Sequence, residues 1–513
     1  MRINILIGGK AGQGINKVSE IVSRVLIKLG YFTFNYRDYP SLIRGGHNFN
    51  VLSVSDERIG SIESKLDVIV AMDEKTIELH KHELKEDGEI ISFEEFKDLG
   101  RNLNIAQSGA LIKILGIDKE VLVKEIESHF KNDEIIKAAE KGFESKEKKF
   151  NLKKLNNKIE IMHGSKGVAL GAINSNIDLY LAYPMTPATG VMHELAGRQI
   201  NNDLMVFQLE NEIAVVNAGL GASFAGAKVM IGSSGGGYDL MTEGLSFQGM
   251  SEIPLVVYLA SRPGPGTGVP TYSLQDDLEI AIYGGHGEFP RVVIAPGDPI
   301  ECIEKTNEAF YLSEKFGCLS ILLSDKHLAE SEFSSDRKSN KIIDVKVERK
   351  VPGEGIVKAS SYEHDEDWNT TESAEITKIM ADKRMKRYEY IKKECGKFEM
   401  IKVYGNPNAK NLVIGWGSTK TVILDAIDSI DGSIKSGKGD WKFLQVLYVK
   451  PLSPQIEKEI KKAGKVILVE QNLTGQLGRL IRERTGIKIE NRILKYDSRP
   501  FYSDELKEEI LKV

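Results

Sequence analysis

The stretch LYLAYPMTPATG, Leu179 to Gly190, decides the fold of the central part of this 513-residue chain. An apolar strand runs directly into two prolines that bracket Thr186. Proline fixes its own backbone angle and disfavours helix in the residue before it, so the chain should stay extended until Pro187 begins a helix. Thr186 should then lie at the carboxyl edge of a parallel sheet, where open α/β folds bind ligands. The alternative is that Thr186 only caps the helix.

Strands and helices alternate on both sides of this stretch. Residues 160–330 contain short apolar strands separated by helical patterns, and similar alternations cover residues 1–150 and 397–513. Residues 331–396 are highly charged and poor in apolar residues, as expected of a linker that wraps another surface. We therefore predict three α/β domains with mostly parallel sheets, joined by this linker.

Composition excludes several classes of protein. The apolar fraction of 41% and the charged fraction of 28% are typical of folded domains. A net charge of -5, without a basic run, argues against nucleic-acid binding, and no segment is long and apolar enough to span a membrane. Cys302, Cys318 and Cys395 form no CxxC pair, so we expect no metal or iron-sulfur site within this chain and a reducing, cytoplasmic setting.

A glycine-rich turn, GGKAGQGIN, covers Gly8–Asn16 between a strand and a helix. Such a loop can present backbone N–H groups to a phosphate at the N-terminus of a helix. It lacks the Lys-Ser/Thr of a P-loop and the spacing of a dinucleotide fingerprint. A tight turn without a ligand is the alternative.

Carboxylates and small residues follow two other predicted strands. Glu210 and Glu212 precede a helix rich in alanine and glycine, and a carboxylate held against such a helix can exchange a proton with a cofactor. An ordinary preference of acidic residues for a helix start is the alternative. The next strand ends in a loop of small residues that includes Ser233, Ser234 and Gly235.

An arginine follows the next strand of this series. Arg262 begins the loop SRPGPGTGVPT, which also contains Thr267, and it should reach the same sheet edge as Thr186. A planar guanidinium beside a hydroxyl suits a carboxylate ligand, because it donates two parallel hydrogen bonds. An ion pair with Asp276 or Asp277 is the alternative.

The segments AYPMTPAT, QLENE, GSSGGGYDLMTEG, SRPGPGTGVPT and YGGHGEFPR, in this order, resemble the α subunit of 2-oxoacid:ferredoxin oxidoreductases, particularly the 2-oxoglutarate type with a γ domain fused in front. GGKAGQG and IRGGHN look like the γ domain. VIGWGST, VEQNLTGQL and KYDSRPF look like the transketolase-like C-terminal domain. The resemblance implies a γ domain over 1–150, a pyrimidine-binding-like α domain over 160–330 and a C-terminal domain over 397–513.

The resemblance implies oxidative decarboxylation of a 2-oxoacid with coenzyme A, aided by thiamine diphosphate. In the family, residues matching Thr186 and Arg262 hold the carboxylate and carbonyl of the substrate, and Tyr183 and Thr267 are predicted to line that pocket. The glutamate on the pyrimidine ring of the cofactor matches Glu212, with Glu210 as the second choice. The remaining predicted cofactor contacts are Ser233, Ser234 and Gly235.

Because this chain has no cysteine cluster to accept single electrons, a β subunit must carry the iron-sulfur cluster, Mg²⁺ and the diphosphate half of the cofactor site. The expected partners are this subunit, in a heterodimer or a dimer of heterodimers, and ferredoxin. The expected substrate is 2-oxoglutarate, with pyruvate or a branched-chain 2-oxoacid as the alternative. A noncatalytic assembly subunit that binds a nucleotide is the alternative from another class.

Overall fold

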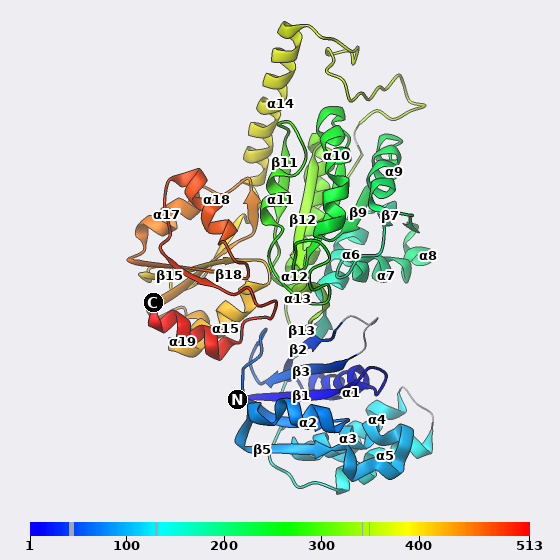
Figure 1. Ribbon diagram of the computed structural model, residues 1–513, viewed down its shortest axis with the longest axis vertical. Helices are drawn as coiled ribbons and strands as arrows, with labels where there is room; N and C mark the ends of the chain where they lie inside the picture. The colour runs from blue at the N-terminus through cyan, green and yellow to red at the C-terminus, as the bar shows by residue number, and fades with distance from the viewer. Residues whose placement is uncertain (41–45, 129–131, 341, 348) are drawn as a thin grey trace. The chain divides into compact units, whose positions relative to one another are not determined.

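The computed structural model describes residues 1–513 except 41–45, 129–131, 341 and 348. Residues 43–45 of the segment IRGGHN lie outside the described residues. The chain divides into two compact units, coloured by residue number in Figure 1. The first unit comprises residues 1–162, 331–337 and 501–508, and the second comprises 163–330, 338–500 and 509–513. The predicted limits of the three domains stay predictions.

The first unit contains a seven-stranded mixed sheet. Its strands, in spatial order, are β5 (Leu84–Ser92), β4 (Leu66–Ala71), β1 (Arg2–Lys10), β3 (His47–Ser55), β2 (Phe32–Asp38), β13 (Glu332–Ser335) and β6 (Glu160–Met162). Strands β1, β4 and β5 are parallel, whereas β3 is antiparallel to both β1 and β2. The short connection of residues 39–46 explains this departure from a parallel sheet, because a parallel partner needs a crossover of about a dozen residues or more.

Apolar spacing in the sequence accounts for the first helix. Ile15, Val18, Val22 and Val25 of α1 are buried on one face at helical spacing, and the helix packs on the sheet. The helices of this unit are α1 (Ile15–Lys28), α2 (Glu74–His80), α3 (Leu103–Ile114), α4 (Lys119–Glu127) and α5 (Asp133–Glu144), with short 3₁₀ segments at Lys81–Glu83 and Phe93–Asn102.

The second unit contains a seven-stranded sheet and a five-stranded sheet. The larger sheet has the order β17 (Tyr448–Lys450), β11 (Arg291–Ile294), β12 (Leu319–Asp325), β10 (Leu255–Ser261), β9 (Val229–Ser233), β7 (Leu179–Ala182) and β8 (Met205–Gln208). All its pairings are parallel except that of β17 with β11. The smaller sheet has the order β14 (Ile401–Gly405), β16 (Trp441–Val446), β15 (Asn411–Trp416), β18 (Lys465–Glu470) and β19 (Asn491–Leu494), and only β14 is antiparallel.

Across the three sheets parallel pairings outnumber antiparallel ones, so the predicted α/β class with mostly parallel sheets is confirmed. Within the second unit, one hydrophobic core includes residues of both sheets, such as Val257 and Ile321 of the larger one and Ile414 and Leu444 of the smaller one. The two sheets of this unit therefore stabilise each other.

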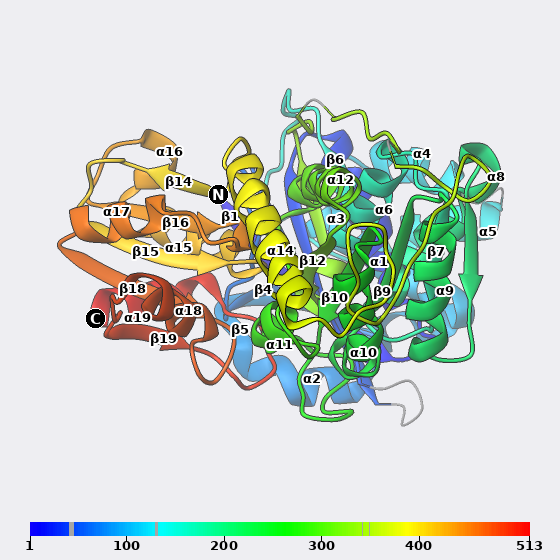
Figure 2. The same cartoon turned by 90° about the horizontal axis from the view of Figure 1, so that it is seen from above.

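The helices of the second unit surround these sheets (Figures 1 and 2). They are α6 (Gly164–Asn174), α7 (Thr189–Ala196), α8 (Gln199–Asn202), α9 (Glu212–Phe224), α10 (Gly235–Ser251), α11 (Leu278–Tyr283), α12 (Pro299–Phe316), α13 (Lys326–Glu330), α14 (Ala374–Cys395), α15 (Thr419–Asp431), α16 (Ser433–Ser436), α17 (Gln455–Lys462) and α18 (Gln476–Thr485). The last helix of the chain is α19 (Ser503–Lys512).

The charged segment of residues 331–396 is divided between the two units: residues 332–335 form β13 in the sheet of the first unit, and the part from residue 338 onward belongs to the second unit. Figure 2 shows α14 running across the second unit. Glu394 of α14 accepts hydrogen bonds from Tyr311 and Lys315 of α12, at 2.8 and 2.9 Å. Arg387 of α14 forms an ion pair of 2.8 Å with Glu252. These contacts attach α14 to α12 and to the C-terminal end of α10.

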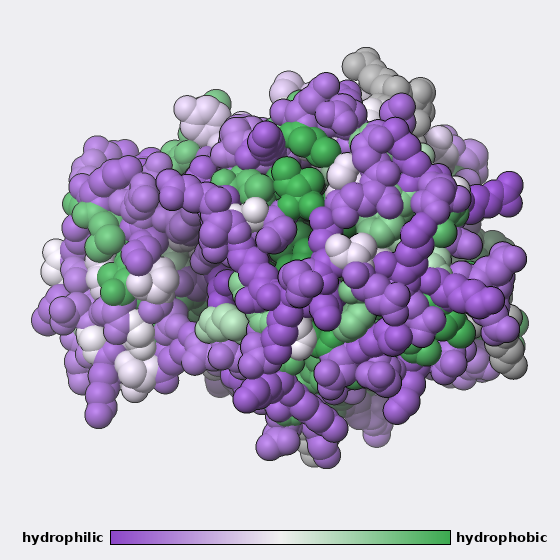
Figure 3. Space-filling model, turned by 90° about the horizontal axis from the view of Figure 1, so that it is seen from below, coloured by the Kyte–Doolittle hydropathy of each residue, from purple (hydrophilic) through white to green (hydrophobic). Residues whose placement is uncertain are grey.

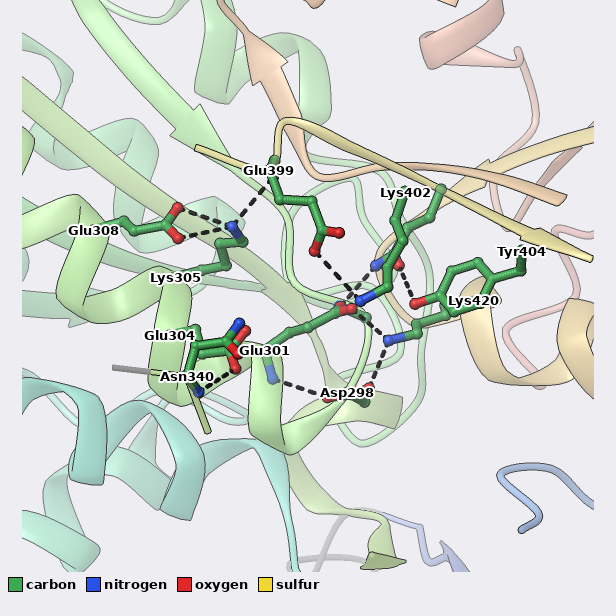
Figure 4. Close-up of polar contacts among 12 residues, drawn as sticks. Asp298, Glu301, Glu304, Lys305, Glu308, Asn340, Glu399, Lys402, Tyr404 and Lys420 are labelled. Atoms are coloured by element: carbon green, nitrogen blue, oxygen red, sulfur yellow. Dashed lines mark hydrogen bonds and ion pairs between the residues drawn. The ribbon is translucent and has the colours of Figure 1, made fainter. Parts of the chain in front are cut away.

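A buried ion cluster joins two parts of the second unit: residues 163–330, here called the central lobe, and residues 397–500, here called the C-terminal lobe (Figure 4). Lys420 of α15 is 1% exposed and contacts Asp298 at 2.5 Å and also Glu301. Glu301 also accepts a hydrogen bond of 2.7 Å from Gln445 of β16. Because the charges are paired and bonded, the cluster can lie in the interior.

Among the described residues, no helix is long and apolar enough to cross a membrane. The face drawn in Figure 3 is mostly hydrophilic, with separate hydrophobic patches.

Candidate active site

The candidate site lies at the carboxyl edge of the larger sheet of the second unit. Strands β7, β8, β9 and β10 are mutually parallel, so the residues that follow them meet at one edge. Thr186 follows β7, Glu212 follows β8, Ser234 follows β9, and Arg262 follows β10. The fold therefore brings these four predicted residues to one edge of the sheet, as expected for residues that each follow a parallel strand.

Thr186 and Arg262 are in direct contact. The guanidinium donates a hydrogen bond of 3.0 Å from Nη1 to the carbonyl oxygen of Thr186, and its Nε is buried without a partner among the described residues. Burial lowers the pKa of Arg262, while the nearby carboxylate of Asp277 raises it. The cation is held in place by one backbone contact and keeps donor capacity for a ligand.

The helix after the proline pair begins later than the sequence suggests. Residues 186–188 form a turn, and α7 begins at Thr189 with Ala188 as its N-cap. Pro187 therefore does not begin the helix, and Thr186 does not cap it. The carbonyl of Thr186 accepts a hydrogen bond from Arg262, and the N–H of Thr189 donates one of 3.2 Å to the carbonyl of Met185.

Glu212 is the first residue of α9 and is 3% exposed. The side chain of Asn211 caps this helix by accepting a hydrogen bond of 2.8 Å from the N–H of Ala214. The Oε1 atom of Glu212 is therefore not used for capping, and it has no hydrogen-bond partner among the described residues. Glu210, by contrast, is exposed. Burial favours Glu212 over Glu210, the same order that the resemblance implies.

Helix α10 approaches Glu212 through a glycine. A Cβ atom added to Gly237 would lie 2.1 Å from Ser233 Oγ and 2.6 Å from Glu212 Oε1, so only glycine fits there. Ser234 is the N-cap of α10 but makes no side-chain capping bond. The hydroxyls of Ser233 and Ser234 are both buried and have no partner in the described part of the chain.

The alternative of an ion pair with Asp276 or Asp277 is not seen: no ion pair joins Arg262 to either carboxylate among the described residues. Asp276 accepts a bond of 3.3 Å from the N–H of Gly264. The carboxyl oxygens of Asp277 lie over Gly235, at 2.6 and 2.7 Å from the position of an added Cβ. Burial, the largest cause, raises the pKa of Asp277 to about 7.

Two predicted substrate residues lie further out. Thr267 is exposed within its loop, and Tyr183 is 38% exposed. Neither is joined to Thr186 or Arg262 by a hydrogen bond between described residues. Sequence reasoning missed Gly237 and the position of Asp277. In the sequence, Gly237 is marked by the glycine triplet of residues 235–237. Asp277 is marked by the pair Asp276 and Asp277, which follows a loop rich in glycine and proline.

In the first unit, Gly14 of the glycine-rich turn has φ 94° and is the N-cap of α1 without a side-chain capping bond. Gln13 folds back on the turn, and its Oε1 accepts a hydrogen bond of 2.6 Å from the N–H of Lys10. These features agree with a tight turn, and the phosphate role stays a prediction.

Six buried polar atoms at the carboxyl edge of the larger sheet lack hydrogen-bond partners in the described chain: Glu212 Oε1, Ser233 Oγ, Ser234 Oγ, Ser261 Oγ, Arg262 Nε and Asp277 Oδ2. Other buried atoms without such a partner lie elsewhere in the second unit, for example Gln248 Oε1, Ser320 Oγ and His364 Nε2. Each unsatisfied buried group costs about 1–3 kcal/mol. The six at this edge include the carboxylate and guanidinium that a polar organic molecule with hydrogen-bonding ring atoms and a carboxylate would need, as thiamine diphosphate and a 2-oxoacid together provide.

Residues 170–395 match the family described as "Pyruvate flavodoxin/ferredoxin oxidoreductase, thiamine diP-bdg". Residues 4–100 match the family "Pyruvate ferredoxin/flavodoxin oxidoreductase". These matches place the chain in the class of oxidoreductases that have a thiamine diphosphate-binding domain.

Full-length relatives define the family more closely. A 2-oxoacid:ferredoxin oxidoreductase subunit alpha of Sulfolobus sp is 29% identical over 100% of this chain and 97% of the relative. The 2-oxoglutarate synthase subunit KorA of Methanocaldococcus jannaschii is 30% identical over 62% of this chain and 90% of the relative. The chain belongs to the 2-oxoacid:ferredoxin oxidoreductase family and corresponds to its α subunit, as the motifs predicted.

A solved structure agrees with this assignment. The 2-oxoglutarate:ferredoxin oxidoreductase from Magnetococcus marinus, with 2-oxoglutarate, coenzyme A and succinyl-CoA bound, superposes with a TM-score of 0.89 at 26% identity. The match covers 99% of each chain.

Proposed function

We propose that this chain is the fused γα subunit of an enzyme that oxidatively decarboxylates 2-oxoglutarate. Coenzyme A is the proposed acyl acceptor and ferredoxin the proposed electron acceptor. The observation that carries the proposal is the set of unpartnered buried polar groups at the carboxyl edge of the larger sheet. The choice of 2-oxoglutarate follows the names of the Methanocaldococcus and Magnetococcus relatives.

Thr186 and Arg262 form the proposed substrate end of the site. The Nε of Arg262 is unpartnered and can donate to the carboxylate next to the reacting carbonyl. The bond from Nη1 to the Thr186 carbonyl fixes the orientation of the guanidinium. Tyr183 and Thr267 would cover the substrate from the rim of the site.

Glu212, Ser233, Ser234 and Gly235 form the proposed cofactor end, with Glu210 outside it. Thiamine diphosphate, when bound, supplies a nucleophilic carbon and accepts the electron pair released by decarboxylation. The free Oε1 of Glu212 can hold a proton on a ring nitrogen. The hydroxyls of Ser233 and Ser234 are free to bond the same ring.

Apolar side chains around this edge support a partner subunit. The elements that form the site, and the loops that follow them, expose large apolar side chains: the exposed fractions are 38% at Tyr183, 50% at Phe207, 51% at Ile213, 52% at Leu240 and 40% at Val269. Exposed apolar surface of this kind is typical of a protein–protein docking face. In the proposal, a β subunit covers them, supplies the iron-sulfur cluster, Mg²⁺ and the diphosphate contacts, and forms a heterodimer or a dimer of heterodimers.

The test is co-expression of this chain with its β subunit, followed by an assay of viologen reduction with thiamine diphosphate and coenzyme A. The substrates to compare are 2-oxoglutarate, pyruvate and a branched-chain 2-oxoacid. Reduction that requires every component and is fastest with 2-oxoglutarate supports the proposal. A faster reaction with another 2-oxoacid would change the substrate, and inactivity of a fully metallated complex would favour a noncatalytic assembly role.

A further inference from the structure

Asp277 lies beside the proposed substrate site, and no contact of its side chain among the described residues gives it a structural role. It is the N-cap of α11 but makes no side-chain capping bond. Its Oδ2 is shielded from solvent and has no hydrogen-bond partner among the described residues. A buried carboxyl with a free oxygen is costly unless it stays protonated or serves a nearby charge.

The groups that face Asp277 come from three elements. Its carboxyl lies over Gly235 at the N-terminus of α10, where the helix dipole favours the ionised form. Arg262, which follows β10, is the nearby cation. The other neighbours are Ser261 of β10, Tyr238 and Asp239 of α10, Arg291 of β11 beyond Tyr238, and the adjacent Asp276.

These neighbours oppose one another. Burial raises the pKa of Asp277 to about 7, and the carboxylates of Asp276 and Asp239 act in the same direction. Ser261 and Arg262 act against them. The hydroxyl of Ser261 is near enough to influence Asp277, yet its Oγ completes no hydrogen bond within the described chain. The carboxyl can therefore change its protonation state near neutral pH.

We infer that Asp277 is a proton-dependent positioning residue for Arg262, which controls how strongly this arginine binds the carboxylate of a 2-oxoacid. When Asp277 is neutral, the charge of Arg262 is available to the substrate. When Asp277 is ionised, it competes with the substrate for that charge. This inference rests on the proposed role of Arg262 in substrate binding.

The first arm of the test uses the complex of this chain with its β subunit. The KM for the 2-oxoacid should rise by about five- to tenfold as the pH rises through about 7, since an opposite charge nearby is worth about that much. Asp277→Asn is permanently neutral and of the same shape, so its KM should stay low across this range. Asp276→Asn keeps the Asp277 carboxyl and is the control: its KM should still rise, over a lower pH range than in the wild-type protein, because the Asp276 carboxylate no longer raises the pKa of Asp277.

The second arm needs neither substrate nor cofactor. A carboxyl whose pKa is raised in the folded state stabilises the fold at low pH, and this contribution is lost as the pH rises toward the folded value. The unfolding temperature of the wild-type chain should therefore fall relative to that of Asp277→Asn between about pH 4 and 7. Asp276→Asn keeps the Asp277 carboxyl and should still show this fall relative to Asp277→Asn, over a lower pH range than the wild-type chain.

Loss of both pH dependences in Asp277→Asn supports the inference. A rise of KM that persists in Asp277→Asn overturns it, whether or not the unfolding arm changes. If Asp277→Asn does not fold, an unfolding temperature of the wild-type chain that does not fall over this pH range overturns it as well. Failure of the proposed function is seen separately, as an Arg262→Ala complex with unchanged KM.

Discussion

At the scale of single residues, burial decides which of the candidate side chains can do chemistry. Glu212 and Glu210 lie two residues apart in the chain, but only Glu212 is enclosed. Asn211 caps the helix, and the Oε1 of Glu212 has no hydrogen-bond partner among the described residues. Arg262 is fixed by one backbone carbonyl and keeps Nε for a ligand. The polarity of the site thus depends on groups that the fold leaves unpaired.

Replacement of Glu212 by glutamine should abolish the proton transfer assigned to it. We expect Glu212→Gln to lower kcat by about 10²- to 10⁴-fold, the range for losing a general acid–base group, with little change in the unfolding temperature. Activity is measured in the complex with the β subunit at saturating thiamine diphosphate. Glu210→Gln, at an exposed position, is the control and should keep its activity. Equal losses in both variants would contradict the assignment.

Replacement of Arg262 by alanine should remove the cation that holds the substrate carboxylate. We expect Arg262→Ala to lose about 2–5 kcal/mol of transition-state stabilisation, as measured by kcat/KM for the 2-oxoacid. Arg482→Ala removes an arginine from an exposed position of α18 and should leave kcat/KM unchanged. An Arg262→Ala enzyme with unchanged kcat/KM would show that the arginine has no part in substrate binding.

At the scale of elements, the close approach of α10 to α9 forms the cofactor end of the site. The first turn of α10 contains three glycines, Gly235, Gly236 and Gly237, which differ in the space around them. An added Cβ at Gly237 meets Ser233 and Glu212, whereas at Gly236 the nearest atom is the carbonyl oxygen of Gly266 at 3.8 Å. A side chain at Gly237 would therefore meet neighbouring atoms, whereas one at Gly236 would have space.

This contrast gives a matched pair of variants. Gly237→Ala should displace Glu212 and Ser233, destabilise the chain by about 1–3 kcal/mol and weaken thiamine diphosphate binding. Gly236→Ala should be neutral or stabilising by up to about 1 kcal/mol, because alanine favours helix. Chemical denaturation measures the stability, and calorimetric titration of the αβ complex measures the binding. A Gly237→Ala protein with unchanged stability would show that α10 can shift at no cost.

At the scale of the whole molecule, charges connect segments that lie far apart in the sequence. Within the second unit, Lys420 of the C-terminal lobe is buried between Asp298 and Glu301 of the central lobe (Figure 4). Strand β17 also continues the larger sheet from the C-terminal lobe. These links explain why the two lobes of this unit share one core.

Loss of Lys420 should leave two carboxylates buried without their cation. We expect Lys420→Met to lower the free energy of unfolding by about 3–5 kcal/mol, as for other broken buried ion pairs. Lys392→Met removes a surface lysine that pairs with Glu389 on α14 and should cost about 1 kcal/mol or less. Urea denaturation of both variants checks the prediction, and equal costs would contradict it.

The sequence was sufficient to predict the α/β class, the family and the sheet edge at which the candidate side chains gather. Apolar strands followed by loops of glycine, proline and serine carry this information locally. The hydrogen bond from Arg262 to the Thr186 carbonyl and the position of Asp277 over Gly235 were not predictable in the same way. Each depends on a partner distant in sequence.

The order of the strands in the first sheet has a consequence for biosynthesis. Between β2 and β6 of this sheet lies β13, which comes far downstream in the chain and pairs with both. At roughly 5–20 residues per second, a ribosome makes β13 about ten seconds or more after residue 162. During this interval β2 and β6 expose unpaired backbone groups to other nascent chains. Early chaperone capture of the emerging N-terminal segment would therefore protect this protein more than capture after release.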